Sequence, residues 1–455
     1  MSHEHPQRMS PTKPPFRHAS VRVLPVVAAA ALLAVVAAPV TGQQPAATEE
    51  PELPGNVVVD VDMVETQVFR IGIPDLLGAA PHGAAGGGVM RNDFTLMPGY
   101  RVIDPRSVRH DLEAEGLGLM RAAWGALSAS GVIKGQVTER GGRLEVEMRY
   151  FHLARGSSPA LERSYSGEPS ELRGFMHDFG NEVLRVITGV PGPFGTHLAY
   201  SRREGPGRKD IWCAAMDGFG ARRVSNGRGI AMLPAWDGEG NLWFTRLMTT
   251  GMWITRTGVR GRQIIAGDGL NMAPAICNGR VYFVSSRQGN SEIYSARPDG
   301  SDVRRLTSNQ AIDVSPACGP DGRIAFVSAR QSSPQIFVMN ADGSDQRRVT
   351  FRGSHNQTPT WCPDPSKQII AFTGRSGGLD VFTMNLATQE YTRLTQGQGS
   401  NKDPAFSPDC RIIAFSSDRR RGEGIYLSSP QGFNQQRVLE GNLETVRWLH
   451  TGRPR

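Results

Sequence analysis

The chain has 455 residues, of which 39% are hydrophobic and 21% charged, and its formal net charge is +8 at pH 7. This length allows two or three domains with buried cores, and the composition is that of a globular protein rather than of a chain disordered throughout. Arginine is spread along the sequence instead of forming one block, so the charge indicates solvated surface and argues against nucleic-acid binding.

The first 45 residues are predicted to be a signal peptide. Lys13, Arg17 and Arg22 precede an apolar stretch from Val23 to Val40, and small and polar residues follow it. This order is typical of a segment that directs export and is then removed. An uncleaved membrane anchor is the alternative, because about 18 apolar residues approach the length that spans a bilayer. No later stretch is apolar enough to do so, and we expect a soluble mature chain outside the cytoplasm.

Residues 46–56 are acidic and proline-rich, and we expect a flexible lead there. Residues 57–190 mix strand and helix patterns, which predicts a small α/β domain. In chain order its expected elements are a strand at 67–73, a loop at the glycine- and alanine-rich 83–88, a strand at 100–104, a helix at 111–130, and strands at 131–138 and 143–153.

The clearest helix is predicted at 170–188. Seven apolar residues in this segment fall on one helical face: Leu172, Phe175, Met176, Phe179, Val183, Val186 and Ile187. Ser170 is in position to cap the first turn, and Gly189 is expected to end the helix. The proline-containing stretch 189–193 then links this domain to the rest of the chain.

From residue 195 to 449 one unit of about 43 residues recurs, which is the spacing of β-propeller blades. Two aromatic columns mark it. The first column is Tyr200, Phe244, Phe283, Phe326, Phe372 and Phe415, and the second is Trp212, Trp253, Tyr294, Phe337, Phe382 and Tyr426. Six copies of each column predict an all-β propeller with six blades.

Within each unit a strand is expected to follow a proline such as Pro316, and tight turns such as Gly319–Gly322 separate the later strands. An edge strand at 347–350 ends one such unit. One more repeat interval after the last proline-containing strand reaches Trp448. The first unit, in contrast, has no such strand before it. We therefore expect the C-terminal strand to pair into the first blade, so that two sheet edges are hidden.

Five cysteines occur at 213, 277, 318, 362 and 410. Export permits disulfides, and the odd number leaves at least one thiol unpaired or paired between chains. Because each cysteine falls in or beside a repeat column, we favour small core residues. The absence of a Cys-x-x-Cys motif gives no support for a metal or redox site.

These residues resemble the TolB family of the bacterial Tol-Pal system. The similarity is carried by "Pro316-Ala-Cys-Gly-Pro-Asp-Gly-Arg-Ile-Ala-Phe326", "Gly131-Val-Ile-Lys-Gly-Gln-Val-Thr138", and "Ile187-Thr-Gly-Val-Pro-Gly192" followed by "Thr196-His-Leu-Ala-Tyr200". The resemblance implies a periplasmic, non-enzymatic monomer that binds the lipoprotein Pal at one mouth of the propeller channel. It also implies contact with TolA through the flexible N-terminus and α/β domain, in support of outer-membrane integrity and cell division.

The resemblance further implies that the Pal contacts lie on the loops that lead into the inner strands. The matching residues here are Leu270, Asn271, Asp313, Val314, His355, Asn356, Gln357, Asn401, Lys402 and Asp403. No cofactor or metal is expected.

Two other classes of function fit an exported propeller. A hydrolase or lyase would gather carboxylates or histidines around the channel, but the only histidines in the repeats are His197, His355 and His450, at unrelated repeat positions. A Gly-x-Ser-x-Gly nucleophile turn is absent. A glycan-binding propeller would expose Trp or Tyr at the channel mouth, whereas most tryptophans here fall in repeat columns that predict blade core.

Overall fold

The computed structural model describes residues 68–450, except 228, 260–261 and 421. The predicted signal peptide (1–45), the acidic lead (46–56) and the first residues of the predicted α/β domain lie outside the described residues. Within the described part of the chain, no helix has both the length and the apolar character that crossing a membrane requires.

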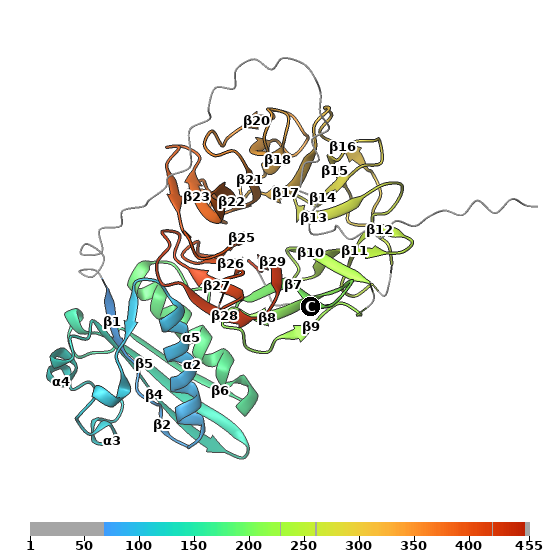
Figure 1. The fold of residues 1–455 in the computed structure, drawn as a ribbon. Coiled ribbons are helices and arrows are strands. Elements are labelled where there is room, and N and C mark those ends of the chain that lie inside the picture. The colour runs from blue at the N-terminus through green and yellow to red at the C-terminus, as the bar shows by residue number, and fades with distance from the viewer. Residues whose placement is uncertain (1–67, 228, 260–261, 421, 451–455) are drawn as a thin grey trace, which may run out of the picture. The chain divides into compact units, whose positions relative to one another are not determined.

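The N-terminal region is a mixed sheet with helices packed on it (Figure 1). Its strands are β1 Phe69–Gly72, β2 Leu77–Gly78, β3 Tyr100–Val102, β4 Gly131–Arg140, β5 Arg143–His152 and β6 Leu161–Gly167. Its helices are α2 His82–Leu96, α3 Leu112–Glu115, α4 Arg121–Ala126 and α5 Leu172–Thr188, with short 3-10 turns at Pro105–Ser107, Leu153–Arg155 and Pro169–Glu171. The strand order is β3-β1-β4-β5-β6. β1 pairs in parallel with β3 and β4, and β4, β5 and β6 pair in antiparallel fashion. This mixed sheet with its helices confirms an α/β architecture.

The loop predicted at 83–88 is wrong, because these residues form the first half of α2. The helix passes so close to the preceding segment that side chains would collide there. A Cβ atom at Gly83 would lie 2.2 Å from the Leu76 carbonyl oxygen, and one at Gly86 would lie 2.7 Å from the Leu76 side chain. The glycines serve close packing, and this need overrides their low intrinsic helix propensity.

Two other helix predictions need correction. The helix expected at 111–130 is divided into α3 and α4, because Gly116 takes a positive φ of 57° and ends α3. The helix at 170–188 is present as α5, and Gly189 ends it in the left-handed conformation as predicted. Ser170 does not cap it; the reciprocal capping bonds are made by Glu168 and Glu171 in the preceding 3-10 turn.

A buried charged cluster fastens the α3–α4 segment to the sheet. Lys134 on β4 lies 2.8 Å from Glu115 at the end of α3, and their side chains are 2% and 1% exposed. Glu115 also accepts hydrogen bonds from the Trp124 indole N–H and the Met120 backbone N–H, and it contacts His110. Burial alone raises the pKa of Glu115, but the hydrogen bonds from Lys134, Met120 and His110 outweigh it, so the pKa lies below its ordinary value.

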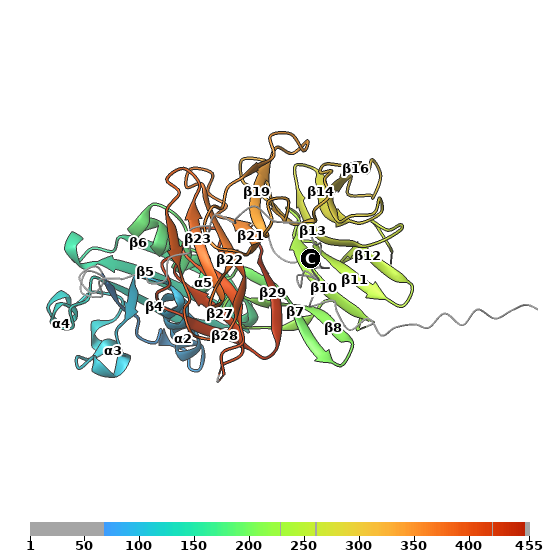
Figure 2. The ribbon, with the colours of Figure 1, turned by 45° about the horizontal axis from the view of Figure 1, so that its top comes forward.

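The remaining strands form five sheets arranged around a common centre (Figures 1 and 2). The seven-stranded sheet holds β7 His197–Gly205, β8 Arg208–Ala215, β9 Arg222–Arg223, β10 Ile230–Trp236, β11 Leu242–Met248, β12 Gly251–Arg256 and β29 Leu443–Trp448. The first two four-stranded sheets are β13 Asn271–Cys277, β14 Arg280–Ser285, β15 Glu292–Ala296, β16 Arg304–Arg305, and β17 Asp313–Cys318, β18 Ile324–Ser328, β19 Gln335–Met339, β20 Arg347–Arg348. The other two are β21 Asn356–Trp361, β22 Ile369–Ser376, β23 Gly378–Asn385, β24 Tyr391–Arg393, and β25 Asn401–Phe406, β26 Ile413–Ser417, β27 Gly424–Ser428, β28 Gln436–Glu440.

In Figure 1 the strands β10, β13, β17, β21, β25 and β29, here called the inner strands, lie toward the centre, and the strands that follow lie progressively farther out. This arrangement is a β-propeller. The predicted pairing of the C-terminal strand is confirmed, because β29 runs antiparallel to β7 with Leu443 opposite Arg202 and Trp448 opposite Leu198. A single parallel bridge between Ile230 and Lys209 joins β10 to β8, so the sheets of the first two repeats are continuous.

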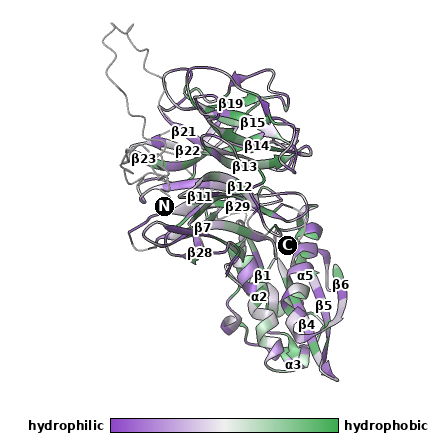
Figure 3. Ribbon diagram, turned by 90° about the vertical axis from the view of Figure 1, so that its right-hand side faces the viewer, coloured by the Kyte–Doolittle hydropathy of each residue, from purple (hydrophilic) through white to green (hydrophobic). Residues whose placement is uncertain are grey.

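The hydrophobic core of the propeller lies between the faces of neighbouring sheets. Phe326 and Phe337 of one sheet, for example, pack with Tyr282 and Ile293 of the sheet before it. The first aromatic column occupies β7, β11, β14, β18, β22 and β26, and every member is less than 5% exposed. Figure 3 shows green hydrophobic segments near β14 and β15, with purple hydrophilic residues elsewhere in the propeller.

A β-bulge recurs in all six inner strands. It sits just before the proline column, at Leu233, Ala273, Ser315, Thr358, Asp403 and Thr445, each with a φ between 50° and 57°. Each inner strand shifts register at this point. The strand expected after each proline therefore begins three or four residues before it, because a bulge accommodates proline inside a strand.

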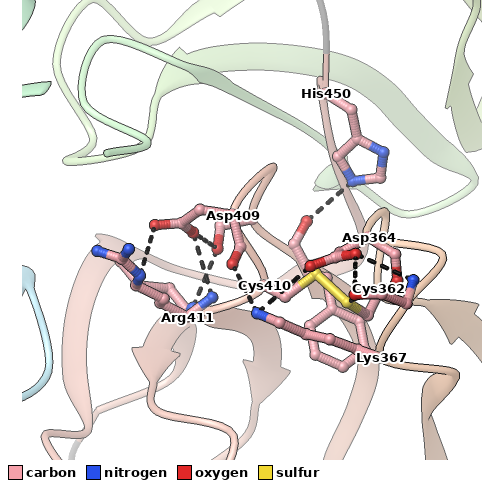
Figure 4. Close-up of a disulfide and its surroundings, with 11 residues drawn as sticks. Cys362, Asp364, Lys367, Asp409, Cys410, Arg411 and His450 are labelled. Atoms are coloured by element: carbon pink, nitrogen blue, oxygen red, sulfur yellow. Dashed lines mark hydrogen bonds and ion pairs between the residues drawn. A yellow bond between two sulfur atoms is a disulfide. The ribbon is translucent and has the colours of Figure 1, made fainter. Parts of the chain in front are cut away.

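Four of the five cysteines form disulfides, so the prediction of five small core residues is wrong for them. Cys277 pairs with Cys318, and Cys362 pairs with Cys410. The first disulfide joins the last residues of β13 and β17, and the second joins Cys362, just after β21, to Cys410 in the turn that follows β25 (Figure 4 shows the second). The Cα atoms of the two bridges lie 6.2 Å and 5.4 Å apart. Cys213 is a buried free thiol, as predicted for a core residue.

Removing either disulfide should destabilise the propeller. The bridges span 41 and 48 residues, and the chain-entropy model assigns a loop of this length about 4 kcal/mol. We expect Cys277→Ser with Cys318→Ser to lower the free energy of unfolding, measured by urea titration, by about that amount. Cys213→Ala is the matched control, because it removes a cysteine but neither bridge. On adding reductant, the control should lose the contribution of both bridges, whereas the double variant should lose only that of the second bridge. Equal reductant sensitivity of the double variant and the unmodified protein would contradict the assignment.

Acid should destabilise the N-terminal domain through Glu115. Its pKa is depressed in the folded state, so its contribution is complete above the ordinary glutamate pKa and is lost as pH falls through the lower folded value. Glu115→Gln should therefore reduce stability at neutral pH and flatten the fall in unfolding free energy between about pH 5 and pH 3. Urea titrations across this pH range test both effects, with the exposed Glu145→Gln as control. A pH dependence identical to that of the unmodified protein would refute this role.

Candidate partner-binding surface

Four inner strands begin with an amide or a carboxylate side chain that is fully buried. These residues are Asn271 on β13, Asp313 on β17, Asn356 on β21 and Asn401 on β25, each 0% exposed. Three of them lie opposite a serine on the next strand of the same sheet. The Ser285 and Ser417 hydroxyls donate to the side-chain oxygens of Asn271 and Asn401 at 2.9 Å and 2.8 Å.

A second set of buried polar residues comes from the third strand of the preceding sheet. Glu292, Gln335 and Asp380 are 0%, 0% and 2% exposed. Gln335 accepts a hydrogen bond from the Asn356 amide at 2.8 Å, and Asp380 accepts one from the Asn401 amide at 3.3 Å.

Between the two sheets that contain Glu292 and Asp313, Asn309 makes the connection. Its backbone N–H donates to Glu292 at 2.9 Å, and its side-chain amide donates to Asp313 at 2.8 Å. We call the residues of these two sets, with Asn309, the buried polar layer. It ties each of three consecutive sheets to the next at the end where the inner strands begin.

Arginines complete the layer. Arg330 donates to Asp313 at 2.7 Å, and Arg393, itself buried, donates to Asp380 at 2.6 Å. Burial raises the pKa of Asp313, although the Ser328 hydroxyl and the Arg330 charge oppose the shift. These ion pairs are hydrogen-bonded on both partners, which is the condition under which buried charges are tolerated.

The structure thus gathers the ten predicted residues at one end of the inner strands but exposes only some of them. Six are buried, namely Asn271, Asp313, Asn356, Gln357, Asn401 and Asp403. The remaining four are partly exposed, namely Leu270, Val314, His355 and Lys402. We call these four the rim residues. Successive side chains along a strand point to opposite faces. When a residue of the layer is buried, the side chain next to it in sequence therefore lies on the other, more exposed face.

Asp403 connects this layer to the closing strand. It takes the bulge conformation, and its carboxylate accepts the backbone N–H of Thr445 on β29 at 3.0 Å. Its own backbone N–H donates to the Thr373 hydroxyl at 3.0 Å. Asp403 therefore links three neighbouring sheets.

Glu444 and Lys209 were missed by the sequence prediction. Glu444 occupies the same position in β29 as Lys402 does in β25, one residue before the bulge, and Lys209 donates to its carboxylate at 2.5 Å. Burial alone raises the pKa of Glu444, but Lys209 and the charges of Lys402 and Arg203 outweigh it, so the pKa is lowered. Aligning the final strand with the five earlier ones would have revealed this position. Within residues 68–450, outside the gaps, His, Cys, Asp and Glu form no group of three suited to a metal ion.

Comparison with known families identifies this arrangement. Residues 57–158 match the model of the TolB amino-terminal domain, and residues 184–373 and 354–452 match that of the TolB beta propeller domain. The chain belongs to the TolB family. The prediction from sequence resemblance is confirmed at this level.

TolB relatives align with part of the chain. The Tol-Pal system protein TolB of Anaeromyxobacter dehalogenans (strain 2CP-C) is 34% identical over 302 residues, which cover 63% of this chain and 66% of the relative. That of Desulfosudis oleivorans is 35% identical over 189 residues, covering 40% and 43%. The chain thus spans between 43% and 66% of the length of these curated relatives.

The crystal structure of TolB from Acinetobacter baumannii has the same fold. It superposes with a TM-score of 0.74 at 21% identity, covering 84% of this chain and 96% of that one. A likeness at this identity supports the fold, and the surface chemistry must be argued from this chain's own residues.

Loss of one member of the buried polar layer should be costly. Asp380→Ala leaves Arg393 buried without its carboxylate partner. Breaking a buried ion pair in this way lowers the free energy of unfolding by about 3–5 kcal/mol. The exposed pair of Asp345 and Arg347, with atoms 3.9 Å apart, supplies the control, since Asp345→Ala should change stability by about 0.5 kcal/mol or less. Thermal and urea unfolding of both variants measure the difference. Equal stabilities would mean that the layer does not hold the sheets together.

Proposed function

We propose that this protein is a periplasmic scaffold of the Tol-Pal system that binds the lipoprotein Pal and TolA and thereby supports outer-membrane integrity and cell division. The observation that carries the proposal is the set of rim residues held on the buried polar layer of a TolB-family propeller. Leu270, Val314, His355 and Lys402 offer apolar contact, hydrogen bonding and positive charge on a rigid support. Such a surface suits recognition of a folded partner.

The proposed architecture is a propeller of six blades closed by the C-terminal strand. The boundaries are a signal peptide at 1–45, a flexible acidic lead at 46–56, a small α/β domain at 57–190 and the propeller at 195–449. Six recurring bulges, the pairing of β29 with β7 and the packing of hydrophobic residues between successive sheets support this interpretation of the seven-stranded sheet as two blades.

A location in the periplasm is supported by the two disulfides, because such bonds persist in oxidising compartments. TolA is proposed to bind the flexible N-terminus and the α/β domain. We propose a monomer that binds no nucleic acid, with no membrane span in the mature chain.

A role without catalysis is proposed because the polar groups of the buried polar layer are engaged in structure. Asn271 accepts from Ser285 and Arg287, and Asp313 is bound by Asn309 and Arg330. A general acid or base needs a reactive atom within reach of a substrate, whereas these atoms are directed at one another.

Calorimetric titration of the purified protein with the soluble domain of Pal from the same organism tests the proposal. We expect saturable binding that weakens at least about tenfold in a variant carrying both His355→Ala and Lys402→Ala, since charged and central contacts dominate such interfaces. Both side chains are partly exposed, so the fold should be retained, which the melting temperature checks.

The matched control is Arg347→Ala on the outer strand β20, where the side chain is 58% exposed. It removes one positive charge far along the sheet from the inner strands and should leave binding unchanged. Absence of binding between folded partners would overturn the Pal assignment, and equal weakening by all variants would show that only net charge matters.

A further inference from the structure

A cavity of about 360 Å³ lies at the opposite end of the inner strands from the rim residues. Its wall is formed where five inner strands end, and it includes Trp236, Cys277, Cys318, Trp361 and Trp448. Its volume falls at the lower end of the range of about 300–1,000 Å³ for small-molecule sites. The cavity therefore fits a small compound or a single residue, and it is too small for a long protein segment.

Apolar side chains form part of the wall of this cavity. Pro274, Pro316 and Pro359 line it, one from each of three successive inner strands. The indole N–H groups of the tryptophans are already used: Trp361 donates to the Ala317 carbonyl at 3.2 Å, and Trp448 donates to the Thr196 hydroxyl at 2.8 Å. The rings thus present carbon surface, which favours an apolar ligand body.

Arg447 supplies the positive charge of the cavity. One of its guanidinium N–H groups donates to the neighbouring Val446 carbonyl at 2.8 Å. Among the residues that the structure describes, no carboxylate forms an ion pair with Arg447, and Asp403 acts on it through its charge alone. Burial lowers the pKa of Arg447, but a guanidinium remains charged in proteins.

Two other ionisable residues line the cavity, and neither forms an ion pair with Arg447 among the described residues. Asp237 is engaged by its own turn, where it accepts hydrogen bonds from the Trp243 indole at 2.9 Å and from Asn241. His450 contacts the Phe406 carbonyl at 3.0 Å through Nε2, beside the Cys362–Cys410 disulfide (Figure 4). Burial lowers the pKa of His450, and the neutral ring that donates through Nε2 has Nδ1 as its acceptor.

We propose that this cavity binds a small organic acid whose carboxylate pairs with Arg447 and whose apolar body packs on the prolines and Trp236. A planar guanidinium with unused N–H groups matches a carboxylate through two parallel hydrogen bonds. The same chemistry is presented by a free N-acylated amino acid and by the C-terminal residue of a peptide. The proposal is independent of Pal binding, because it concerns the other end of the inner strands.

The experiment titrates the purified protein with N-acetyl-leucine in a calorimeter and compares it with N-acetyl-leucinamide, which has the same body but no charge. We expect the acid to bind at least about tenfold more tightly, the difference that one charge-assisted contact supplies. A short peptide ending in leucine with a free carboxylate forms the second arm. Tighter binding of the peptide assigns the site to chain termini, and tighter binding of the single residue assigns it to free acids. Equal binding of acid and amide, or no binding of either acid, overturns the proposal.

Two variants locate the site. Arg447→Met keeps the side-chain stem and should weaken acid binding at least about tenfold, whereas Arg297→Met, at an arginine that is 64% exposed after β15, should not. Thr360→Phe fills the cavity without changing charge and should abolish binding, so the result does not depend on Arg447 alone. Melting temperatures identify any variant that fails to fold. Undiminished binding in a folded Arg447→Met or Thr360→Phe protein would place the acid elsewhere.

Discussion

The pairing of β29 with β7 is the constraint on which the rest of the propeller depends. The last described strand lies beside the first strand of the propeller, and this pairing brings together Ser201 and Thr445, which are 244 positions apart in the sequence. Without it, β7 and β25 would each present an unpaired edge or an uncovered face to water. A contact so distant in sequence is entropically expensive to form, and the structure surrounds it with further contacts. Asp403 binds the Thr445 backbone, Ser201 and Thr445 share a hydrogen bond of 2.7 Å, and Lys209 binds Glu444.

The two ends of the inner strands are held by different chemistry. Where the strands begin, hydrogen bonds and ion pairs of the buried polar layer connect one sheet to the next. At the other end, one disulfide joins β13 to β17, and the second joins the segments that follow β21 and β25. The division has a physical reason: the polar layer relies on complete hydrogen bonding, whereas a disulfide holds two strands without requiring buried charge. The covalent end surrounds a cavity with proline and tryptophan side chains in its wall, and the polar end supports hydrogen-bonding groups at its rim.

Much of the propeller could be predicted from the sequence, because the same strand pattern occurs in several copies of a tandem repeat. The aromatic columns at Phe283 and Phe326 mark buried strands in every copy, and the C-terminal strand followed from counting. The disulfides were missed although their signal was present: cysteines about one repeat apart, near strand ends, lie on neighbouring strands. Single helices were less predictable. The glycines of α2 are needed because Leu76 packs closely against the helix, and a local sequence pattern does not contain this information.

The candidate surface was predictable in position but not in the role of each residue. Asn356 and Lys402 both precede a proline by two or three residues, and only the fold separates them, placing the first in the interior and the second at the rim. The bulge explains this difference. It inserts one extra residue before the proline, so that the residues on either side of it are re-aimed relative to a regular strand. Asn, Asp and Thr at the bulge or beside it can then bond to neighbouring strands, and the polar residues that looked most suited to binding become those that hold the blades in place. The side chains left for a partner are fewer and less polar, with Leu270 and Val314 beside His355 and Lys402. A surface of this composition favours a partner that brings apolar contact together with negative charge.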